Sequence, residues 1–128
     1  MVPGLVGKAE MIVKKEDLVR TLGSVDVDVL STPRLVHLLE SAAIEAIREF
    51  IPADQWSLGV MVNVKHLSPT PLGMKVTAHA LLKEIRKDWL HFIVDAYDEK
   101  GKVAEGEHER VLIPKKEFLE KVEKKRSG

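Results

Sequence analysis

The chain has 128 residues, of which 45% are hydrophobic and 31% charged, and its 20 basic residues equal its 20 acidic ones. This composition is typical of a globular protein, and the length suits one domain over residues 1–128 with a single core. Zero net charge provides no basic face for nucleic acid or for an anionic membrane. The absence of cysteine excludes a disulfide framework, a thiol nucleophile and a cysteine-ligated metal site.

Nothing along the chain predicts a targeting signal or a membrane span. Residues 1–7 lack the basic start and the long apolar run of a signal peptide. No apolar stretch approaches the roughly 20 residues that a membrane-crossing helix needs. We therefore expect a cytoplasmic protein that binds neither membranes nor nucleic acid.

The chain up to residue 30 predicts only short elements. Residues 8–14 read as a first strand, and residues 16–22 as a short helical turn that Gly23 stops. Residues 25–29 alternate apolar and acidic side chains, which predicts an extended segment.

One long helix should follow. Ser31 or Thr32 can serve as its N-cap, and Pro33 suits the first turn because its missing N–H would have no helical partner there. Pro52 ends the element. Its apolar residues recur at helical spacing over a wide arc, as in a helix that lies against a sheet: Leu35, Leu38, Leu39, Ala42, Ala46 and Ile47.

Four strand-like runs and a charged helix complete the chain. A loop separates the first two runs, and Gly101 can take the positive φ of a hairpin turn between the last two. We predict an α+β fold in which a curved antiparallel meander wraps one long central helix. The expected strands cover residues 58–68, 76–86, 90–97 and 102–113, and the last helix covers residues 115–125.

Glu40 is a carboxylate on an apolar helix face. A buried carboxylate is costly unless it is paired or protonated, which makes Glu40 a candidate catalytic residue. A partner in Arg34 or His37, or a contact between protomers, would explain it equally. Its neighbours at i−4, i+3, i+4 and i+7 are all apolar: Val36, Ala43, Ile44 and Ile47.

His66 breaks a strand pattern in the same way. A buried acid and a buried imidazole in a chain with one core can satisfy each other, which favours a shared site. A hydrogen-bonded core histidine is the structural alternative for His66, and an N-cap role is the alternative for Thr32. With period two, His66 ends an apolar row on one face of the sheet: Leu58, Val60, Val62 and Val64.

His108 alternates with glutamates over residues 105–110, a pattern that invites a metal site. The same alternation places His108 on the face opposite Glu107 and Glu109. The three side chains would therefore not converge, and we expect no metal.

Three stretches occur in an order typical of one family. They are Ser31-Thr32-Pro33 running into residues 38–43, residues 58–66 followed by 70–74, and residues 104–110. Together they span about residues 30–113, most of the chain, and resemble the fluoroacetyl-CoA thioesterase-like branch of the hotdog superfamily.

The resemblance implies a site at Thr32, Glu40 and His66, with a glycine, Gly59, close to the bound thioester. It also implies hydrolysis of an acyl-CoA thioester, without metal or cofactor, by a homodimer or higher homo-oligomer with two sites at the interface. The fluoroacetyl-selective enzyme carries an aromatic lid before the helix. Residues 25–30 contain no aromatic side chain, so we expect a short or medium acyl chain instead.

Thioester hydrolysis needs an activated nucleophile, a proton for the leaving thiolate and a donor to the oxyanion. Glu40 is the candidate base for water, or attacks directly, and His66 would orient it or carry the proton. Thr32 would bind substrate or water, or act as the nucleophile. One regular helix separates Thr32 from Glu40 by roughly 12 Å. Either the Thr32 segment folds back, or two protomers share each site.

The alternative function is a non-catalytic acyl-CoA-binding module, which acts as a sensor or carrier. Such a passive pocket gains nothing from burying Glu40. A dehydratase of the same fold would need an Asp-to-His pairing that the chain does not show. A purely structural oligomer leaves both Glu40 and His66 unexplained, so the thioesterase is the preferred hypothesis.

Overall fold

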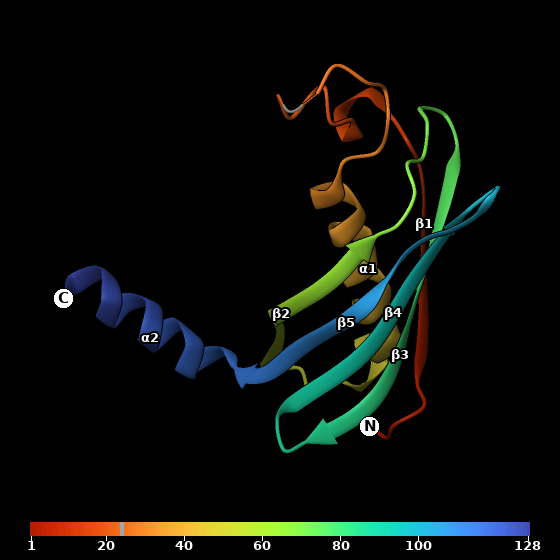
Figure 1. Ribbon diagram of the computed structural model, residues 1–128. Helices are drawn as coiled ribbons and strands as arrows, with labels where there is room; N and C mark the ends of the chain where they lie inside the picture. Colours follow the sequence, from red (N-terminus) through yellow and green to blue (C-terminus); the bar gives the residue numbers. More distant parts are fainter. Residues whose placement is uncertain (24) are drawn as a thin grey trace.

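The computed structural model describes residues 1–23 and 25–128, and its centre is an antiparallel sheet curved around one long helix (Figure 1). The α+β hotdog fold implied by the resemblance is thus confirmed. The elements are β1 (Val6–Ile12), a 3₁₀ turn (Lys15–Asp17), α1 (Thr32–Ile47), a second 3₁₀ turn (Arg48–Phe50), β2 (Gln55–His66), β3 (Lys75–Arg86), β4 (Trp89–Asp98), β5 (Gly101–Pro114) and α2 (Lys115–Ser127).

The strand order in the sheet is β1-β3-β4-β5-β2, and neighbouring strands are antiparallel. The predicted meander is confirmed for β3, β4 and β5. It is wrong for β2, which pairs with β5 instead of β3. The segment after β2 is tied to the start of α1, because Leu30 N–H donates to the Thr70 carbonyl at 2.8 Å and the buried Thr70 hydroxyl donates to Asp98 at 2.9 Å. Within the described residues, β2 is therefore an edge strand, which pairs with β5 on one side only.

α1 begins where the sequence predicts, but its N-cap is Ser31. The Ser31 hydroxyl accepts a hydrogen bond from the Arg34 N–H, and Pro33 lies in the first turn. Thr32 is therefore the first helical residue, and its side chain does not cap the helix. The face of α1 against the sheet buries apolar side chains at helical spacing: Leu35, Leu38, Leu39, Ala42, Ala43, Ala46 and Ile47.

β1 crosses α1 at very short range. A Cβ added to Gly7 would lie 2.1 Å from the Ala42 carbonyl oxygen and 2.4 Å from the Ala46 nitrogen. A side chain at this crossing would push the strand off the helix, so glycine on β1 and alanines on α1 allow the two backbones to approach. The close crossing holds α1 firmly on the concave side of the sheet.

β2 contains a bulge that changes which of its residues face α1. The register against β5 shifts between Gly59, which lies opposite Arg110, and Met61, which lies opposite Glu109. A bulge places one extra residue in its strand, so side chains before it face the other way from those that a continuous period-two pattern predicts.

The predicted apolar row on β2 is therefore correct only beyond the bulge. There Val62, Val64 and His66 lie opposite His108, Gly106 and Ala104, and so share the face of the sheet on which His108 and Ala104 are buried. Before the bulge the row is wrong. Ser57 and Gly59, in place of Leu58 and Val60, are turned toward α1 and its neighbours.

Residues 25–29 do not form the expected strand. The described part of this segment is bent, and only Val29 makes an isolated bridge to another segment. Asp26 and Asp28 both pair with Arg20. The acidic side chains thus bind the preceding segment, and the backbone of residues 25–29 follows a bend instead of a strand. Ser24 lies outside the described residues.

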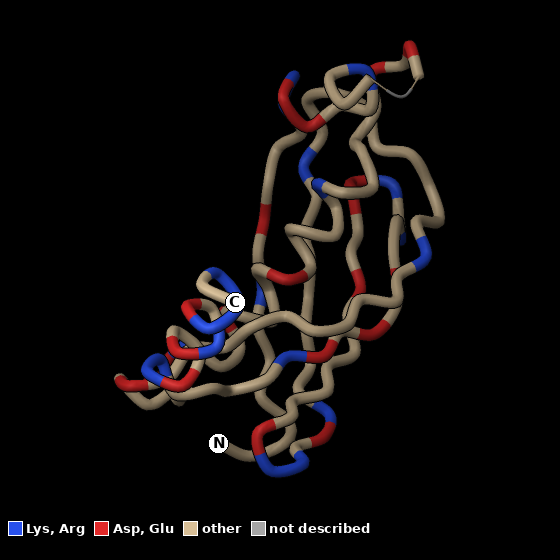
Figure 2. Tube along the Cα trace, turned by 90° about the vertical axis from the view of Figure 1, so that its left-hand side faces the viewer, with Lys and Arg blue, Asp and Glu red and all other residues tan. Residues whose placement is uncertain are grey.

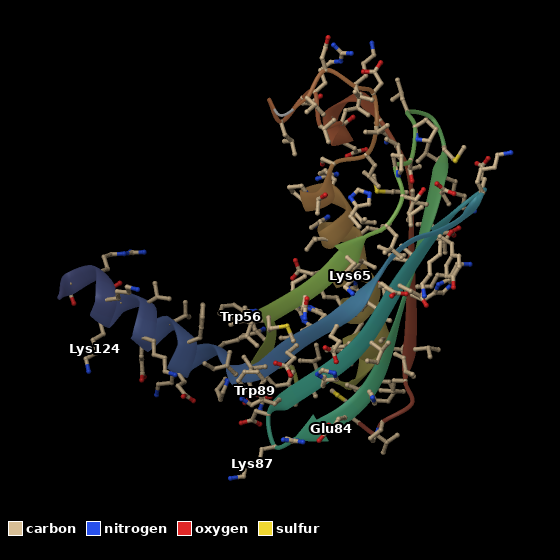
Figure 3. The ribbon with its side chains drawn as sticks, viewed as in Figure 1. Trp56, Lys65, Glu84, Lys87, Trp89 and Lys124 are labelled. Carbon is tan, nitrogen blue, oxygen red and sulfur yellow. The ribbon has the colours of Figure 1, made fainter. Side chains whose placement is uncertain are left out.

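α2 leaves the sheet after β5 and projects away from it (Figure 1), with basic and acidic residues interleaved along its length (Figure 2). At its base, Phe118 packs edge-on against Trp56, which Figure 3 labels, with 5.8 Å between ring centroids. Within the described chain, neither α1 nor α2 combines the length and apolar character that crossing a membrane requires.

Candidate functional site

Thr32 and His66 lie together although they are far apart in the sequence. Thr32 is the first residue of α1, and His66 is the last residue of β2. A hydrogen bond of 2.8 Å joins Thr32 Oγ1 to His66 Nδ1. The hydroxyl therefore orients the imidazole ring, which is what a histidine that transfers protons needs.

The other nitrogen of the His66 ring has no partner among the described residues. His66 Nε2 is buried and makes no hydrogen bond. Burial also lowers the pKa of His66, against the opposing effect of the nearby Ser68 backbone, and so favours the neutral imidazole. Because a buried polar atom without a partner costs free energy, a group from outside this protomer would be bound favourably at Nε2.

Glu40 lies on the flank of α1 that meets β2 and β5, with its side chain 33% exposed. Its Oε2 is 3.5 Å from Arg110 Nη1 and 3.9 Å from His108 Nε2. The predicted half-burial of this carboxylate is confirmed. Arg34 is not its partner, because the Arg34 Nε binds the Asp17 carboxylate at 2.7 Å.

The Arg110 guanidinium is fixed by several hydrogen bonds. Its Nε donates to Ser57 Oγ at 2.6 Å, and its Nη2 donates to the Ser57 carbonyl at 2.9 Å. Its Nη1 donates to His108 Nε2 at 3.1 Å and to Glu40 at 3.5 Å. Burial lowers the pKa of Arg110 and Glu40 opposes that shift, but a guanidinium stays charged in proteins. A fixed cation thus faces the Glu40 carboxylate.

Gly59 allows these charged groups to approach the backbone of β2 closely. A Cβ on Gly59 would lie 2.8 Å from Glu40 Oε2 and 3.3 Å from both Arg110 Nη1 and His108 Cε1. A water or a thioester oxygen next to Gly59 would meet a carboxylate that accepts protons and a guanidinium that stabilises negative charge. Both are needed when a tetrahedral oxyanion forms.

The Thr32–His66 pair and the Glu40 cluster do not meet within one chain. Thr32 and Glu40 both belong to α1, so about 12 Å of helix rise separates them. Gly59 and His66 are separated by about 20 Å along β2, whose far end Lys65 marks in Figure 3. The Thr32 segment does not fold back, and Glu40 and His66 of one chain do not satisfy each other.

Sequence reasoning missed Arg110, His108 and Ser57 as members of the Glu40 cluster. The sequence of β5 contained one pattern that could have identified two of them. Ala104, Gly106, His108 and Arg110 recur at every second position, so a row of small residues on the covered face of β5 continues into two polar ones. The predicted orientation of His108 away from the glutamates is confirmed, and it points toward α1.

Acidification from about pH 7.5 to about pH 5.5 should lower the free energy of unfolding. Burial lowers the pKa of His66 and of His108 below the ordinary 6.5, so the unfolded chain binds more protons than the native one below that pH. The two histidines stabilise the native state fully above pH 6.5. This stabilisation is lost as the pH falls from 6.5 through their lowered pKa values. Urea unfolding at both pH values measures it.

The control is the exposed His37. His37→Gln should leave the pH dependence of unfolding unchanged, whereas His66→Gln combined with His108→Gln should flatten it. Equal stability of the native chain at the two pH values would contradict the burial argument.

Comparison with known proteins shows the family to which this chain belongs. The model of the fluoroacetyl-CoA-specific thioesterase family matches residues 13–116. A fluoroacetyl-CoA thioesterase of Streptantibioticus cattleyicolor is 33% identical over 98 residues, which are 77% of this chain and 70% of that protein. A thioesterase superfamily member from Thermus thermophilus superposes with a TM-score of 0.92 at 26% identity, covering 98% of this chain and 93% of the other. A variant of the fluoroacetyl-CoA thioesterase FlK in complex with acetyl-CoA superposes with a TM-score of 0.90 at 28% identity, covering 98% of each chain. This chain belongs to the fluoroacetyl-CoA-specific thioesterase family.

Proposed function

We propose that this protein hydrolyses short- or medium-chain acyl-CoA thioesters in the cytoplasm, at two equivalent sites that both protomers of a homodimer form. Hydrolysis of an acyl-CoA thioester follows from the family; the acyl length, the dimer, the location and the site residues are the proposal. The observation that carries the shared site is the unpartnered, buried Nε2 of His66, which lies far from the Glu40 of its own chain.

The edge of β2 is the surface on which we place the second protomer. No strand of the described residues pairs with its outer side, and two side chains of this edge strand, Val60 and Val62, are 46% and 41% exposed. Open strand edges with apolar side chains associate readily unless something covers them. Antiparallel pairing of β2 with its own copy about a two-fold axis would cover both edges at once.

Such pairing reverses the strand direction across the axis. With the axis near Val62 and the bulged residue skipped, the partner's His66 would lie opposite Ser57, whose hydroxyl binds Arg110 of the Glu40 cluster. Each site would then combine Glu40, Gly59 and Arg110 of one protomer with the Thr32–His66 pair of the other. This arrangement explains why the two groups are separated within a single chain.

In this site Glu40 acts as the general base. It removes a proton from water, and the water oxygen bonds to the thioester carbonyl carbon while Arg110 stabilises the oxyanion. The tetrahedral intermediate collapses with cleavage of the C–S bond. The proton that Glu40 took from water passes through the partner's His66, oriented by the partner's Thr32, to the departing sulfur, which returns Glu40 and His66 to their starting states. The products are the free acid and coenzyme A.

The acyl group should be short or medium in length. The structural relative described above binds acetyl-CoA, which supports a CoA thioester with a small acyl group here. Residues 25–30, which precede α1, contain no aromatic side chain. Without a bulky aromatic lid there is no physical reason for selection of fluoroacetyl over acetyl or slightly longer groups.

Thiol release from a panel of acyl-CoA esters, from fluoroacetyl- to hexanoyl-CoA, tests this function. The chain contains no cysteine, so a thiol reagent detects only the product. We expect turnover that is greatest for a short or medium acyl chain and no preference for fluoroacetyl-CoA over acetyl-CoA. Esters that raise the melting temperature without being cleaved would identify a passive binding module instead. Sedimentation of a monomer at assay concentration would contradict the shared site.

A further inference from the structure

His108 is buried in the sheet beside the Glu40 cluster. It is 1% exposed, and its ring stacks on the buried Phe92 at 6.0 Å between centroids, with 27° between the ring planes. His108 Nδ1 lies 2.8 Å from the carbonyl oxygen of Met61. A carbonyl only accepts hydrogen bonds, so Nδ1 carries the proton. In the neutral ring, Nε2 is then a lone-pair acceptor.

That acceptor is occupied by Arg110. The Arg110 Nη1 donates to His108 Nε2 at 3.1 Å, and the same nitrogen donates to Glu40 Oε2 at 3.5 Å. Ser57 binds the other side of the guanidinium through Nε and Nη2. Nη1 has two hydrogens, so when His108 accepts one, the plane of the guanidinium directs the second toward Glu40.

Only the neutral ring can accept this bond. Burial lowers the pKa of His108, and the adjacent Arg110 adds to that effect, while the Met61 carbonyl, Glu40 and Glu109 oppose it. Met61 belongs to β2, Glu40 to α1 and Arg110 to the strand of His108, and Glu109 acts from the opposite face of the same strand. A protonated ring would present a second donor to Nη1, so the arrangement requires the neutral form that burial favours.

The Met61 bond links the same ring to the β2 bulge. Met61 is the first paired residue after the shift that turns Gly59 toward Glu40. The imidazole thus connects the two features that lie beside Gly59: the bulge, through Nδ1, and the guanidinium, through Nε2. No other side chain of the described cluster bonds to both.

We propose that His108 is a positioning residue, whose neutral Nε2 holds the Arg110 guanidinium in the orientation that aligns Glu40 beside Gly59. It does not touch the reacting atoms and acts through Arg110. The inference rests on the proposed role of Glu40 as base, but the arrangement of His108 and Arg110 is testable without substrate.

Two substitutions separate the functions of the two ring nitrogens. His108→Gln can place its side-chain oxygen where Nε2 lies, and so retains an acceptor for Arg110. His108→Asn can place its amide nitrogen where Nδ1 lies, and so retains the donor to Met61 but leaves Nη1 of Arg110 without its acceptor at position 108. Both variants lose the aromatic ring that packs on Phe92, so loss of packing affects them alike and is monitored by the melting temperature.

The first readout is the NMR spectrum of the Arg110 guanidinium in the full chain labelled with ¹⁵N-arginine and assigned with Arg110→Lys. A held guanidinium gives resolved, slowly exchanging Nη protons. We expect these signals in the native protein and in His108→Gln, and their loss in His108→Asn. Signals retained in His108→Asn, or lost in both variants, would overturn the proposal.

The second readout is acyl-CoA hydrolysis. Misplacing Glu40 should lower kcat of His108→Asn by about 10- to 100-fold with little change in KM, while His108→Gln stays within about threefold of the native rate. Equal loss of kcat in both variants would assign His108 a packing role only. If the native protein cleaves no thioester, the proposed function fails, and the NMR result still decides the role of His108.

Discussion

Replacing Glu40 by glutamine should reduce kcat for the best acyl-CoA substrate by about 100-fold or more. Glutamine keeps the shape of the side chain and can still accept a hydrogen bond from Arg110, but it cannot take a proton from water. The change therefore removes the base and leaves the geometry around Gly59 in place. Steady-state thiol release gives kcat, and thermal unfolding shows whether the fold is retained.

The matched control for this substitution is Glu45→Gln on the same helix. Glu45 pairs with Arg48 on the exposed side of α1, away from Gly59 and the sheet. The Glu45→Gln variant should keep the native kcat, because it removes one negative charge from α1 without contacting the Glu40 cluster. A Glu40→Gln variant that hydrolyses at the native rate would show that Glu40 is not the base.

Replacing His66 by alanine should lower kcat by a similar factor of about 100. The change removes the ring nitrogen that we assign to protonation of the leaving thiolate. It also frees the Thr32 hydroxyl, whose bond to Nδ1 orients the ring. His79→Ala is the matched control, because the exposed His79 bonds only to Asp95 among the described residues. Native activity of His66→Ala would remove the Thr32–His66 pair from the mechanism.

Local patterns predicted the elements of this fold well, because they depend on neighbours in the chain. The helical spacing of apolar residues and Pro33 marked the start of α1, whereas its end lies at Ile47, before the 3₁₀ turn that leads to Pro52. Period-two runs and turn residues located β2 to β5, and Gly101 does take a positive φ in the hairpin turn. The half-burial of Glu40 followed in the same way from its helix face.

The pairing of β2 was not predictable in the same way. Which strand it joins depends on how the loop after it packs against the start of α1, a contact between distant segments. The bulge between Gly59 and Met61 was hidden, because apolar residues at alternate positions ran through it without interruption. A glycine inside a strand was the one local hint of irregularity.

The site was predictable in its members but not in its contacts. Thr32 rested on the resemblance, and its bond to His66 joins residues that are 34 positions apart. Arg110 is 70 positions from Glu40. A buried carboxylate needs a partner, but sequence spacing does not identify the distant cation that pairs with it. The separation of Glu40 from His66 became evident only when both were placed on known elements.

A mixture of two inactive variants tests the shared site most directly. Glu40→Gln and His66→Ala are purified with different tags, unfolded together in equal amounts and refolded, and the mixed dimer is verified by tandem affinity capture. In a shared site, one of the two sites of each mixed dimer contains native Glu40 and the partner's native His66. We predict that the mixture recovers about one quarter of the native activity, because half of the dimers are mixed and each has one intact site. Mixed dimers that form but hydrolyse no faster than either variant alone would contradict a site built from both protomers.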